Sequence, residues 1–152
     1  MEGVTMNFLF KAKRIDNGEW IEGVPYYGVN AGLEIVLEII PLTNFRGKQV
    51  HFWAERQAVD PDTLTQFTGR YDSKRKKIFA GDILKVSCTD EYSYEENLIV
   101  KFNEELCGFR VYSDSGYTEG DLPNAGELCD TYVVEIIDNE FDTTKKWAWR
   151  GL

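Results

Sequence analysis

The sequence has few of the side chains that most enzymes use for covalent or metal chemistry. It contains one histidine, His51, and three cysteines, Cys88, Cys107 and Cys129. No Cys-x-x-Cys pair occurs, which argues against a structural zinc site, so we expect reduced and mostly buried thiols. Ser-His-Asp or Cys-His catalysis would have to use His51. Because His51 lies in an apolar stretch, we expect it to be an ordinary strand residue.

Phosphate-binding loops and long hydrophobic runs are also missing. Neither G-x-x-x-x-G-K-[ST] nor G-x-G-x-x-G occurs. The longest apolar stretch, Leu33–Leu42, includes Glu34 and Glu38 and falls far short of the roughly 20 residues of a transmembrane helix. The first residues lack the basic and apolar regions of a signal peptide. We therefore expect a cytoplasmic protein with no membrane partner.

Positive charge is scarce and unevenly distributed. The 152 residues carry 17 bases and 26 acids, a net charge of −9, which disfavours a general nucleic-acid-binding surface. Residues 43–86 hold nine bases and five acids, whereas residues 87–142 hold two bases and fifteen acids. With 43% apolar and 14% aromatic residues, the chain is expected to fold around a real core as one domain or two small units.

Apolar residues recur mainly with a period of two, which predicts a mainly β protein. The expected strands lie near residues 7–13, 19–24, 33–40, 49–53, 66–69, 83–86, 98–102, 108–112 and 132–137, and an apolar pair and a Gly-Asp turn precede the strand at 83–86. Asn17-Gly18 predicts a tight hairpin turn between the first two strands, because both positions tolerate positive φ. Short strands with turn signals at this spacing are typical of a small barrel or sandwich.

Two short helical turns interrupt the strand pattern. Asp60 is a candidate N-cap, Pro61 suits the first helical position, and Asp62 favours a helix N-terminus. Near the end of the chain, the Asp-Thr-Thr run 142–144 predicts a cap for a short helix over Lys145–Trp149. Between them, Gly81 is expected to supply an unusual backbone angle and Asp82 to bond nearby amides.

A basic cluster is the candidate nucleic-acid contact. Its members surround the aromatic residues Phe67 and Tyr71, on which bases could stack: Arg70, Lys74, Arg75, Lys76 and Lys77. The alternative interpretation is a solvated turn. For the run Lys74–Lys77 we favour the turn, because its four charges give little affinity at physiological salt when the rest of the protein repels a polyanion.

Acidic pairs dominate the following segment. They are Asp90-Glu91, Glu95-Glu96 and Glu104-Glu105. Adjacent residues on a strand point to opposite faces, so such pairs do not converge on one ligand, and a solvated acidic face is the simpler interpretation. The sharper hypothesis is an acidic surface between Asp90 and Asp130 that docks onto a basic partner. A metal enzyme built on Asp60, Asp62 and Asp82 is the least favoured alternative.

One extended motif resembles a known family. Residues 59–69 read V-D-P-D-T-L-T-Q-F-T-G, Asp72 follows, and residues 77–83 read K-I-F-A-G-D-I. This is similar to the signature of the YopX family, approximately V-D-P-x-T-[VL]-x-Q-[YF]-T-G, a Lys/Asp-rich turn, and I-[YF]-x-G-D-[IL]. Phe10–Trp20 resembles the family's N-terminal hairpin, and Val134–Asn139 resembles a closing strand that usually reads V-I-G-N.

The sequence departs from the family pattern at three places. Asp138 stands where the family usually has Gly, so we expect Asp138 to use its tolerance of left-handed geometry. Ala80 occupies a position that is often acidic. Met6 aligns with the natural start of the family, which leaves Met1–Thr5 as an extension.

The resemblance implies a protein of bacteriophage or prophage origin, in the cytoplasm of a bacterial host, with an SH3-type barrel in its C-terminal part. It carries no established activity, catalytic residue, metal or cofactor, and we expect none. The matching positions are types that build caps and turns, with recognition around Gln66 and Thr68 left open: Asp60, Pro61, Thr63, Gln66, Phe67, Thr68, Gly69, Gly81 and Asp82.

We therefore expect a mainly β, non-enzymatic protein in two parts. Residues 1–70 form a β-hairpin and strand unit, and residues 71–152 form an SH3-like small barrel with a short C-terminal helix. The expected partner is an unidentified host or phage protein that meets the acidic face. Nucleic-acid binding through the basic cluster and self-association are the alternatives left open.

Overall fold

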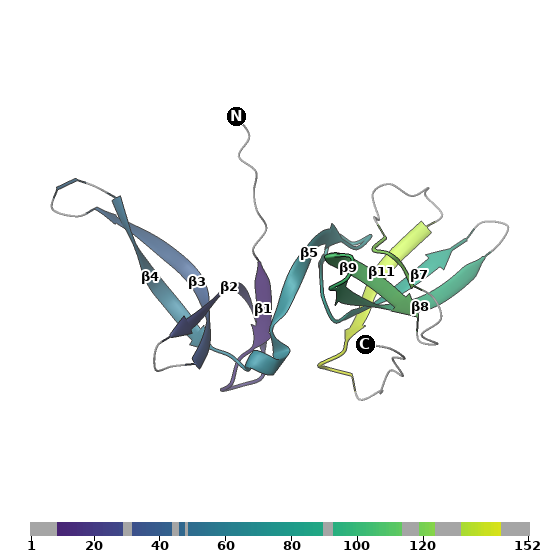
Figure 1. The fold of residues 1–152 in the computed structure, drawn as a ribbon, viewed down its shortest axis with the longest axis horizontal. Helices are drawn as coiled ribbons and strands as arrows, with labels where there is room; N and C mark the ends of the chain where they lie inside the picture. The colour runs from purple at the N-terminus through teal and green to yellow at the C-terminus, as the bar shows by residue number, and fades with distance from the viewer. Residues whose placement is uncertain are drawn as a thin grey trace. The chain divides into compact units, whose positions relative to one another are not determined.

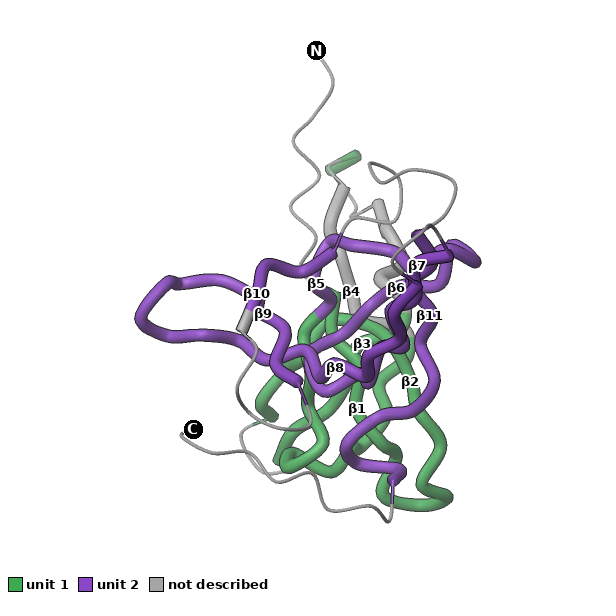
Figure 2. Tube along the Cα trace, turned by 90° about the vertical axis from the view of Figure 1, so that its right-hand side faces the viewer, with its two compact units in different colours: residues 1–66 green, residues 67–152 purple. Residues whose placement is uncertain are grey.

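The chain folds as a mainly β protein, which confirms the expected fold class. The computed structural model describes residues 9–28, 32–43, 46–47, 49–89, 93–113, 119–123 and 132–143. Within these ranges, no helix is long and apolar enough to cross a bilayer. The helix expected over Lys145–Trp149 lies outside the described residues. The chain divides into two compact units, residues 1–66 and 67–152 (Figure 2).

Most of the described residues lie in strands (Figure 1). The elements are, in chain order, β1 (Phe10–Lys13), β2 (Trp20–Gly28), β3 (Gly32–Thr43), β4 (Gln49–Ala58), the 3₁₀ turn η1 (Pro61–Thr63), β5 (Thr65–Tyr71), β6 (Lys77–Phe79), β7 (Asp82–Cys88), β8 (Tyr94–Asn103), β9 (Gly108–Ser113), β10 (Glu119–Asp121) and β11 (Tyr132–Asn139). The helical turn expected at Pro61 and the strand expected at His51 are both confirmed.

The strands pair in two antiparallel sheets. One has the order β4-β3-β2-β1-β5-β6 and the other the order β10-β9-β8-β7-β11. Strand β5 belongs to both units: Thr65 and Gln66 pair with β1, whereas Phe67 and Tyr71 pair with β6. The division between the units falls within this strand, and the expected boundary between residues 70 and 71 lies in the same strand.

In the first unit, the segment after β1 contacts the segment after β4. Arg14, just after β1, bridges Val59, just after β4, and the amide of Ile15 donates to the carbonyl of Ala58 at 3.3 Å. The small core of this unit consists of Ala12, Leu33, Ile35 and Val59, with Ile21 and Leu64 packed against them.

The first hairpin forms where Asn17-Gly18 predicts it, but its turn is longer than expected. The amide of Arg14 donates to the carbonyl of Glu19 at 2.9 Å, and the amide of Gly18 donates to the carbonyl of Arg14 at 3.0 Å. Gly18 has a φ of 73°, whereas Asn17 does not adopt positive φ. Instead, the Asn17 side chain accepts the amide of Glu19 at 2.9 Å. A loop closed by Gly18 therefore replaces a two-residue turn.

The second unit has a larger core between its strands. Period-two alternation along β7 and β8 directs one set of side chains inward. The buried members are Ile78, Leu84, Val86, Leu98, Val100, Val111 and Val134. Cys88 is also buried, as expected, but Cys107 is exposed because it occupies the turn between β8 and β9. The expectation of a buried thiol was wrong there, and Cys129 lies outside the described residues.

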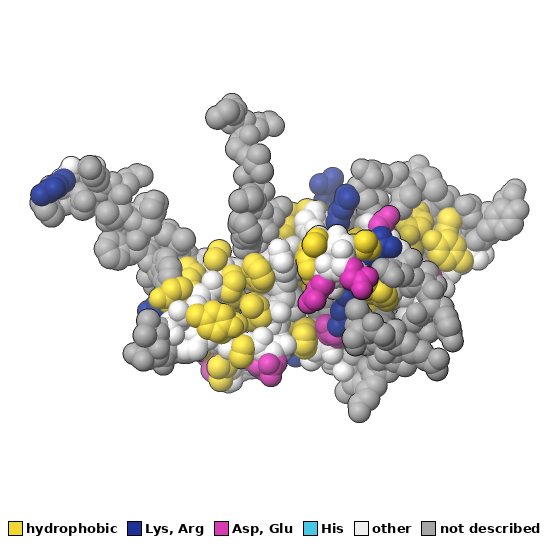
Figure 3. Space-filling model, viewed as in Figure 1, with side chains coloured by type: hydrophobic (Ala, Val, Ile, Leu, Met, Phe, Trp, Pro, Cys, Tyr) yellow, Lys and Arg dark blue, Asp and Glu magenta, His cyan; other side chains and the backbone are white. Residues whose placement is uncertain are grey.

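Exposed hydrophobic side chains are common on the first unit. Figure 3 shows them gathered on its visible face. The large hydrophobic residues exposed in this unit include Ile15, Val24, Tyr27 and Leu37. Their presence beside so small a core means that packing within the described part of this unit leaves much apolar surface in water.

Gly23 in β2 lies close against the neighbouring strand β3. A Cβ added there would lie 2.2 Å from the carbonyl oxygen of Val36 and 2.5 Å from Cγ2 of Ile35. Because the carbonyl belongs to the backbone of a paired strand, Gly23→Ala should destabilise the protein by about 1–3 kcal/mol in chemical denaturation.

Gly120→Ala is the matched control for that substitution. Its Cβ would meet nothing closer than Cγ2 of Val111 at 3.8 Å. We expect its free energy of unfolding to stay within about 0.5 kcal/mol of the wild-type value. Equal effects of the two substitutions would contradict the close approach at Gly23.

Candidate functional site

The first part of the signature builds a turn that is fastened to β1. Oδ1 of Asp60 accepts the amide of Asp62 at 3.0 Å, with Pro61 in the first position of η1. The hydroxyl of Thr63 donates to the carbonyl of Asp60 at 2.8 Å and accepts the amide of Lys13 at 2.9 Å. The amide of Asp60 donates to the carbonyl of Lys13 at 2.8 Å. The predicted cap is confirmed, and Thr63 joins it to a distant strand.

The second part builds a bulge in β5. Phe67 pairs with Phe79 and Tyr71 with Lys77, so more residues lie between the pairs on β5 than on β6. The Thr68 hydroxyl donates to the carbonyl of Ile78 at 2.8 Å, and the next residue, Gly69, has a φ of 82°. Bulges of this kind bend a strand and favour glycine where φ is positive.

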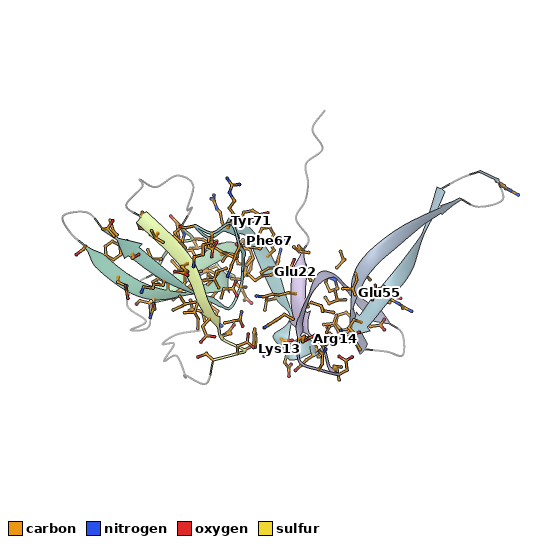
Figure 4. All side chains as sticks on the ribbon, turned by 180° about the vertical axis from the view of Figure 1, so that it is seen from behind. Lys13, Arg14, Glu22, Glu55, Phe67 and Tyr71 are labelled. Atoms are coloured by element: carbon orange, nitrogen blue, oxygen red, sulfur yellow. The ribbon has the colours of Figure 1, made fainter. Side chains whose placement is uncertain are left out.

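Aromatic rings line the same strand. The ring of Phe67 meets that of Phe79 at 5.6 Å and that of Tyr71 at 5.4 Å, the latter edge to face (Figure 4). Phe67 is buried, whereas Tyr71 is 46% exposed. Gln66, where recognition was left open, is half-buried and pairs with Phe10.

A buried carboxylate organises the basic turn. Asp72, only 3% exposed, accepts the amides of Lys74 at 2.9 Å and Lys76 at 2.8 Å through Oδ1. Its Oδ2 accepts the amide of Ile136 in β11 at 3.3 Å. Next to it, Ser73 exchanges two hydrogen bonds with the backbone of Val134, at 2.8 and 2.9 Å. The turn is thus attached to β11 on both sides.

The basic side chains project from this fixed turn. Arg70, Lys74, Arg75 and Lys76 are exposed, and Lys77 is half-buried. Lys74 forms an ion pair with Glu135 of β11. The hydrogen bond and charge of Glu135 raise the pKa of Lys74, and Lys74 lowers the pKa of Glu135 in return. Part of the positive charge is therefore neutralised within the unit.

The last part of the signature forms a buried corner. Asp82 is 1% exposed; its Oδ2 accepts the amide of Phe79 at 2.8 Å and its Oδ1 accepts the side-chain amide of Asn139, also at 2.8 Å. The Asn139 oxygen accepts the amide of Phe141 at 2.9 Å. Donors from the end of β6 and the end of β11 therefore converge on one carboxylate.

Gly81 completes this corner, as the sequence predicts. It has a φ of 86°, donates its amide to the carbonyl of Val100 at 2.7 Å, and accepts the amide of Glu140 at 2.9 Å. A Cβ there would lie 2.8 Å from Oε1 of Glu140, which itself pairs with Lys101. Both the backbone angle and the close approach therefore favour glycine.

The expectation for Asp138 was wrong. The described non-glycine residues with positive φ are Arg75 and Cys107. Asp138 lies within β11 and pairs with Ile83, next to a shift in register that follows Ile136. Its Oδ1 accepts the amide of Asn139 at 2.8 Å. A bulge in the strand, not a left-handed residue, makes the bend at this place.

These turns and corners fall within the region that a family model matches. The model, described as YopX protein, matches residues 13–139. The chain belongs to the YopX family. Comparison with curated proteins and with solved structures gives no significant match. In this YopX-family chain, Asp60, Asp72 and Asp82 each accept backbone amides, so these signature acids fix loops and strand ends.

The carboxylates of the enzyme alternative are divided between the two units. Asp60 and Asp62 lie in the first unit and Asp82 in the second. Among the residues described, no group of three or more His, Cys, Asp or Glu side chains could hold a metal ion. The Asp82 oxygens already accept two donors inside a core, an arrangement that suits a structural carboxylate.

The acidic face is partly neutralised by bases on neighbouring strands. Glu95 pairs with Lys85 at 2.9 Å, and Arg110 pairs with Asp121. Of the acidic pairs expected here, Asp90-Glu91 lies outside the described residues, as does Asp130. Glu104 and Glu105 are both exposed in the turn between β8 and β9.

Two exposed hydrophobic residues beside Glu104 and Glu105 were not anticipated. Leu106 is 61% exposed in the turn, and Phe102, which stacks edge to face on Phe109 at 5.4 Å, is 48% exposed. The signal in the sequence is the position of Leu106 directly after an acidic pair and before a strand. Apolar side chains at a turn are poorly placed for folding and suit contact with another molecule.

A donor–acceptor exchange tests the buried corner. Asp82→Asn sets an amide group against the amide of Asn139, so we expect a loss of about 2–4 kcal/mol of unfolding free energy in chemical denaturation. The double variant Asp82→Asn with Asn139→Asp restores one acceptor for each donor and should recover part of this loss. A double variant no more stable than the sum of the two single changes would contradict the arrangement.

Proposed function

We propose that this YopX-family chain is a non-enzymatic interaction module of phage or prophage origin. Its partner is a basic protein of the host or the phage. In this proposal the C-terminal unit is the SH3-type barrel that the family resemblance implies, acting in the host cytoplasm. The binding surface is the hairpin tip, which we define as Phe102, Glu104, Glu105 and Leu106.

The hairpin tip has a fixed shape, which supports this proposal. Oδ1 of Asn103 accepts the amide of Leu106 at 2.9 Å, and Nδ2 of Asn103 donates to the Tyr112 hydroxyl at 3.0 Å. Cys107 closes the turn with a φ of 49° and donates its amide to the carbonyl of Glu104 at 3.3 Å. A turn held in this way needs little ordering when a partner binds.

The chemistry of the hairpin tip indicates the kind of partner. An apolar centre flanked by charge is typical of protein interfaces, because apolar contact supplies affinity and charge supplies orientation. Leu106 and Phe102 provide the apolar contact, and Glu104 and Glu105 provide negative charge on a protein whose net charge is already −9. This surface suits a partner with a basic rim around a hydrophobic pocket.

The internal use of the signature acids supports a binding role over a reaction. A general acid or base must reach a substrate proton, directly or through one water. Asp72 and Asp82 are buried and accept backbone or amide donors from their own unit. This is the single observation that carries the non-enzymatic part of the proposal.

Charge reversal at the hairpin tip tests the proposed surface. Glu104→Lys with Glu105→Lys should reduce capture of host proteins by the immobilised chain at least about tenfold, since like charges then face the partner's basic rim. Quantitative mass spectrometry of the captured proteins is the measurement. Leu106→Ser should weaken capture of the same proteins.

The control changes the same charge elsewhere. Asp62→Lys with Asp142→Lys alters two exposed acids that are not part of the hairpin tip and should leave capture unchanged. If the tip variant retains the proteins that the wild-type chain retains, the hairpin tip is not the binding surface.

Nucleic-acid binding by the basic turn is the second candidate function. The observation that favours it is the fixed turn, which presents Tyr71, 46% exposed, on the same segment as Arg70 and the exposed bases Lys74–Lys76. An exposed aromatic ring beside cations is the usual element of single-strand binding. The pairing of Lys74 with Glu135 and the net charge of −9 make this candidate the weaker one.

Fluorescence anisotropy with labelled single- and double-stranded oligonucleotides tests this second candidate. If it is right, Arg70→Gln with Lys76→Gln should weaken binding to single strands. The same change should lower the slope of affinity against salt by about 0.7 for each phosphate that the variant no longer neutralises. Arg46→Gln, an exposed base of the other unit, is the control. The absence of any anisotropy change at low salt removes this candidate.

A further inference from the structure

A row of three side chains crosses the sheet of the second unit where strand β8 begins. Strands β8, β7 and β11 are neighbours in this sheet (Figure 1). Cys88, the last residue of β7, pairs in register with Tyr94 of β8 on one side and with Tyr132 of β11 on the other. Because register partners on adjacent strands share a face of the sheet, the three side chains belong to one face.

This face of the sheet is the one that carries the core. In the next row of the same face, Val86 pairs with Val134 of β11 and with Glu96 of β8. Both valines are buried members of the core of the second unit, and Tyr132 packs against that core. Glu96 therefore belongs to the core-facing side of its strand.

Glu96 is a charged group in an unusual position. An ionised carboxylate is rarely found on the core side of a sheet unless a group of opposite charge accompanies it. Glu96 is half-buried, and it forms no ion pair within the described part of the chain. Its neighbour Glu95, on the other face of β8, is exposed and pairs with Lys85 at 2.9 Å. Of these two acids, the one on the core side is thus the one with room for a cation.

The groups around the Tyr132 hydroxyl are negative or accept hydrogen bonds. Burial raises the pKa of Tyr132 to about 12, together with a hydrogen bond to Tyr94 and the nearby groups of Cys88 and Glu96. The contribution of Glu96 means that its carboxylate lies near this hydroxyl. A negative potential that disfavours a phenolate favours a cation at the same place. Tyr94 is 47% exposed, so a ligand can approach these groups from solvent.

We propose that Tyr94, Glu96 and Tyr132 form a binding site for the guanidinium group of an arginine side chain. We call these three residues the tyrosine site. In this site the carboxylate of Glu96 pairs with the guanidinium group, and the exposed ring of Tyr94 stacks on it. Guanidinium fits such a site because it is planar and weakly hydrated, and because it both stacks on aromatic rings and donates two parallel hydrogen bonds to a carboxylate. An ammonium group is compact and strongly hydrated, so it fits less well.

The occupant of the tyrosine site is an arginine of a basic protein. The net charge of −9 attracts such a partner, and residues 87–142, which include the whole site, hold two bases and fifteen acids. The tyrosine site is at the first residues of β8, whereas the hairpin tip is at the end of the same strand. The inference therefore goes beyond the hairpin tip, because the tyrosine site can bind an arginine whether or not the tip has a partner.

An NMR titration of the full chain tests the tyrosine site with a peptide probe. The probe is acetyl-Gly-Arg-Gly-amide, and the control peptide has citrulline, the neutral isostere, in place of arginine. The arginine peptide should shift the ring signals of Tyr94 and Tyr132 until they saturate. The citrulline peptide should bind at least about tenfold more weakly, because it offers no charge to Glu96. A peptide with lysine in the same position that binds as tightly as the arginine peptide would contradict the choice of guanidinium.

Two adjacent acids provide a matched pair of variants. Glu96→Gln removes one charge from the tyrosine site, and Glu95→Gln removes the same charge from the opposite face of the same strand. Glu96→Gln should weaken binding of the arginine peptide at least about tenfold, whereas Glu95→Gln should change it less than about twofold. Tyr94→Leu should weaken binding about two- to fivefold, because it removes the stacking ring and keeps the carboxylate. Amide spectra like those of the wild-type chain verify that each variant is folded.

Three results would each overturn the tyrosine site. They are no saturable shift in the wild-type chain, equal affinity for the arginine and citrulline peptides, and equal effects of Glu95→Gln and Glu96→Gln. The variant Glu104→Lys with Glu105→Lys separates this proposal from the proposed function, since it should still bind the arginine peptide at the tyrosine site. A wild-type chain that captures host proteins through the hairpin tip but does not bind the arginine peptide would overturn the tyrosine site alone.

Discussion

The second unit depends most on the hydrogen bonds that the buried carboxylate of Asp82 accepts. This carboxylate receives the amide of Phe79 and the side chain of Asn139, residues separated by most of that unit's sequence. A charged group in a core is costly unless donors surround it, and here the donors are the backbone amide of Phe79 and the side-chain amide of Asn139. Asp72 has the same role at the basic turn, where it accepts the amides of Lys74 and Ile136. Both carboxylates therefore lose contact with water, and both hold backbone amides in fixed positions.

The signature residues fix the fold, and other residues form the surfaces. The polar residues of the signature lie at the cap, the bulge, the basic turn and the buried corner, where their hydrogen bonds hold the backbone. The surfaces that we propose for partners are built from other residues, those of the hairpin tip, the bases of the turn and the tyrosine site. Function in such a chain can change at its surface while the signature stays the same, because fold and binding depend on different side chains.

Local features of the fold could be predicted from the sequence, and long-range ones could not. The Asp60 cap and the Gly81 angle depend on neighbouring residues, so the residue types alone indicate them. The partnership of Asp82 with Asn139 and the bridge from Arg14 to Val59 join segments far apart in the chain. Nothing local to either member of such a pair identifies the other.

The candidate surfaces show the same limit. The basic cluster and the acidic pairs are visible in the sequence, but their ion pairs with opposing strands, such as Lys74 with Glu135, depend on register. Leu106 and Cys107 are exposed because they lie in a turn. The sequence does not predict the geometry of this turn, because cysteine is uncommon at the positive φ that Cys107 adopts. The prediction for Asp138 was wrong because a shift in the register of β11, and not a left-handed residue, makes the bend there.

Amide hydrogen exchange measured residue by residue tests the central claim most directly. The amides of Lys74, Lys76 and Phe79 bond to carboxylate oxygens of Asp72 and Asp82. If those carboxylates organise the unit, these three amides exchange as slowly as amides of the neighbouring β7 ladder, since they open only when the unit does. Exchange at the rate of an open loop would contradict the account.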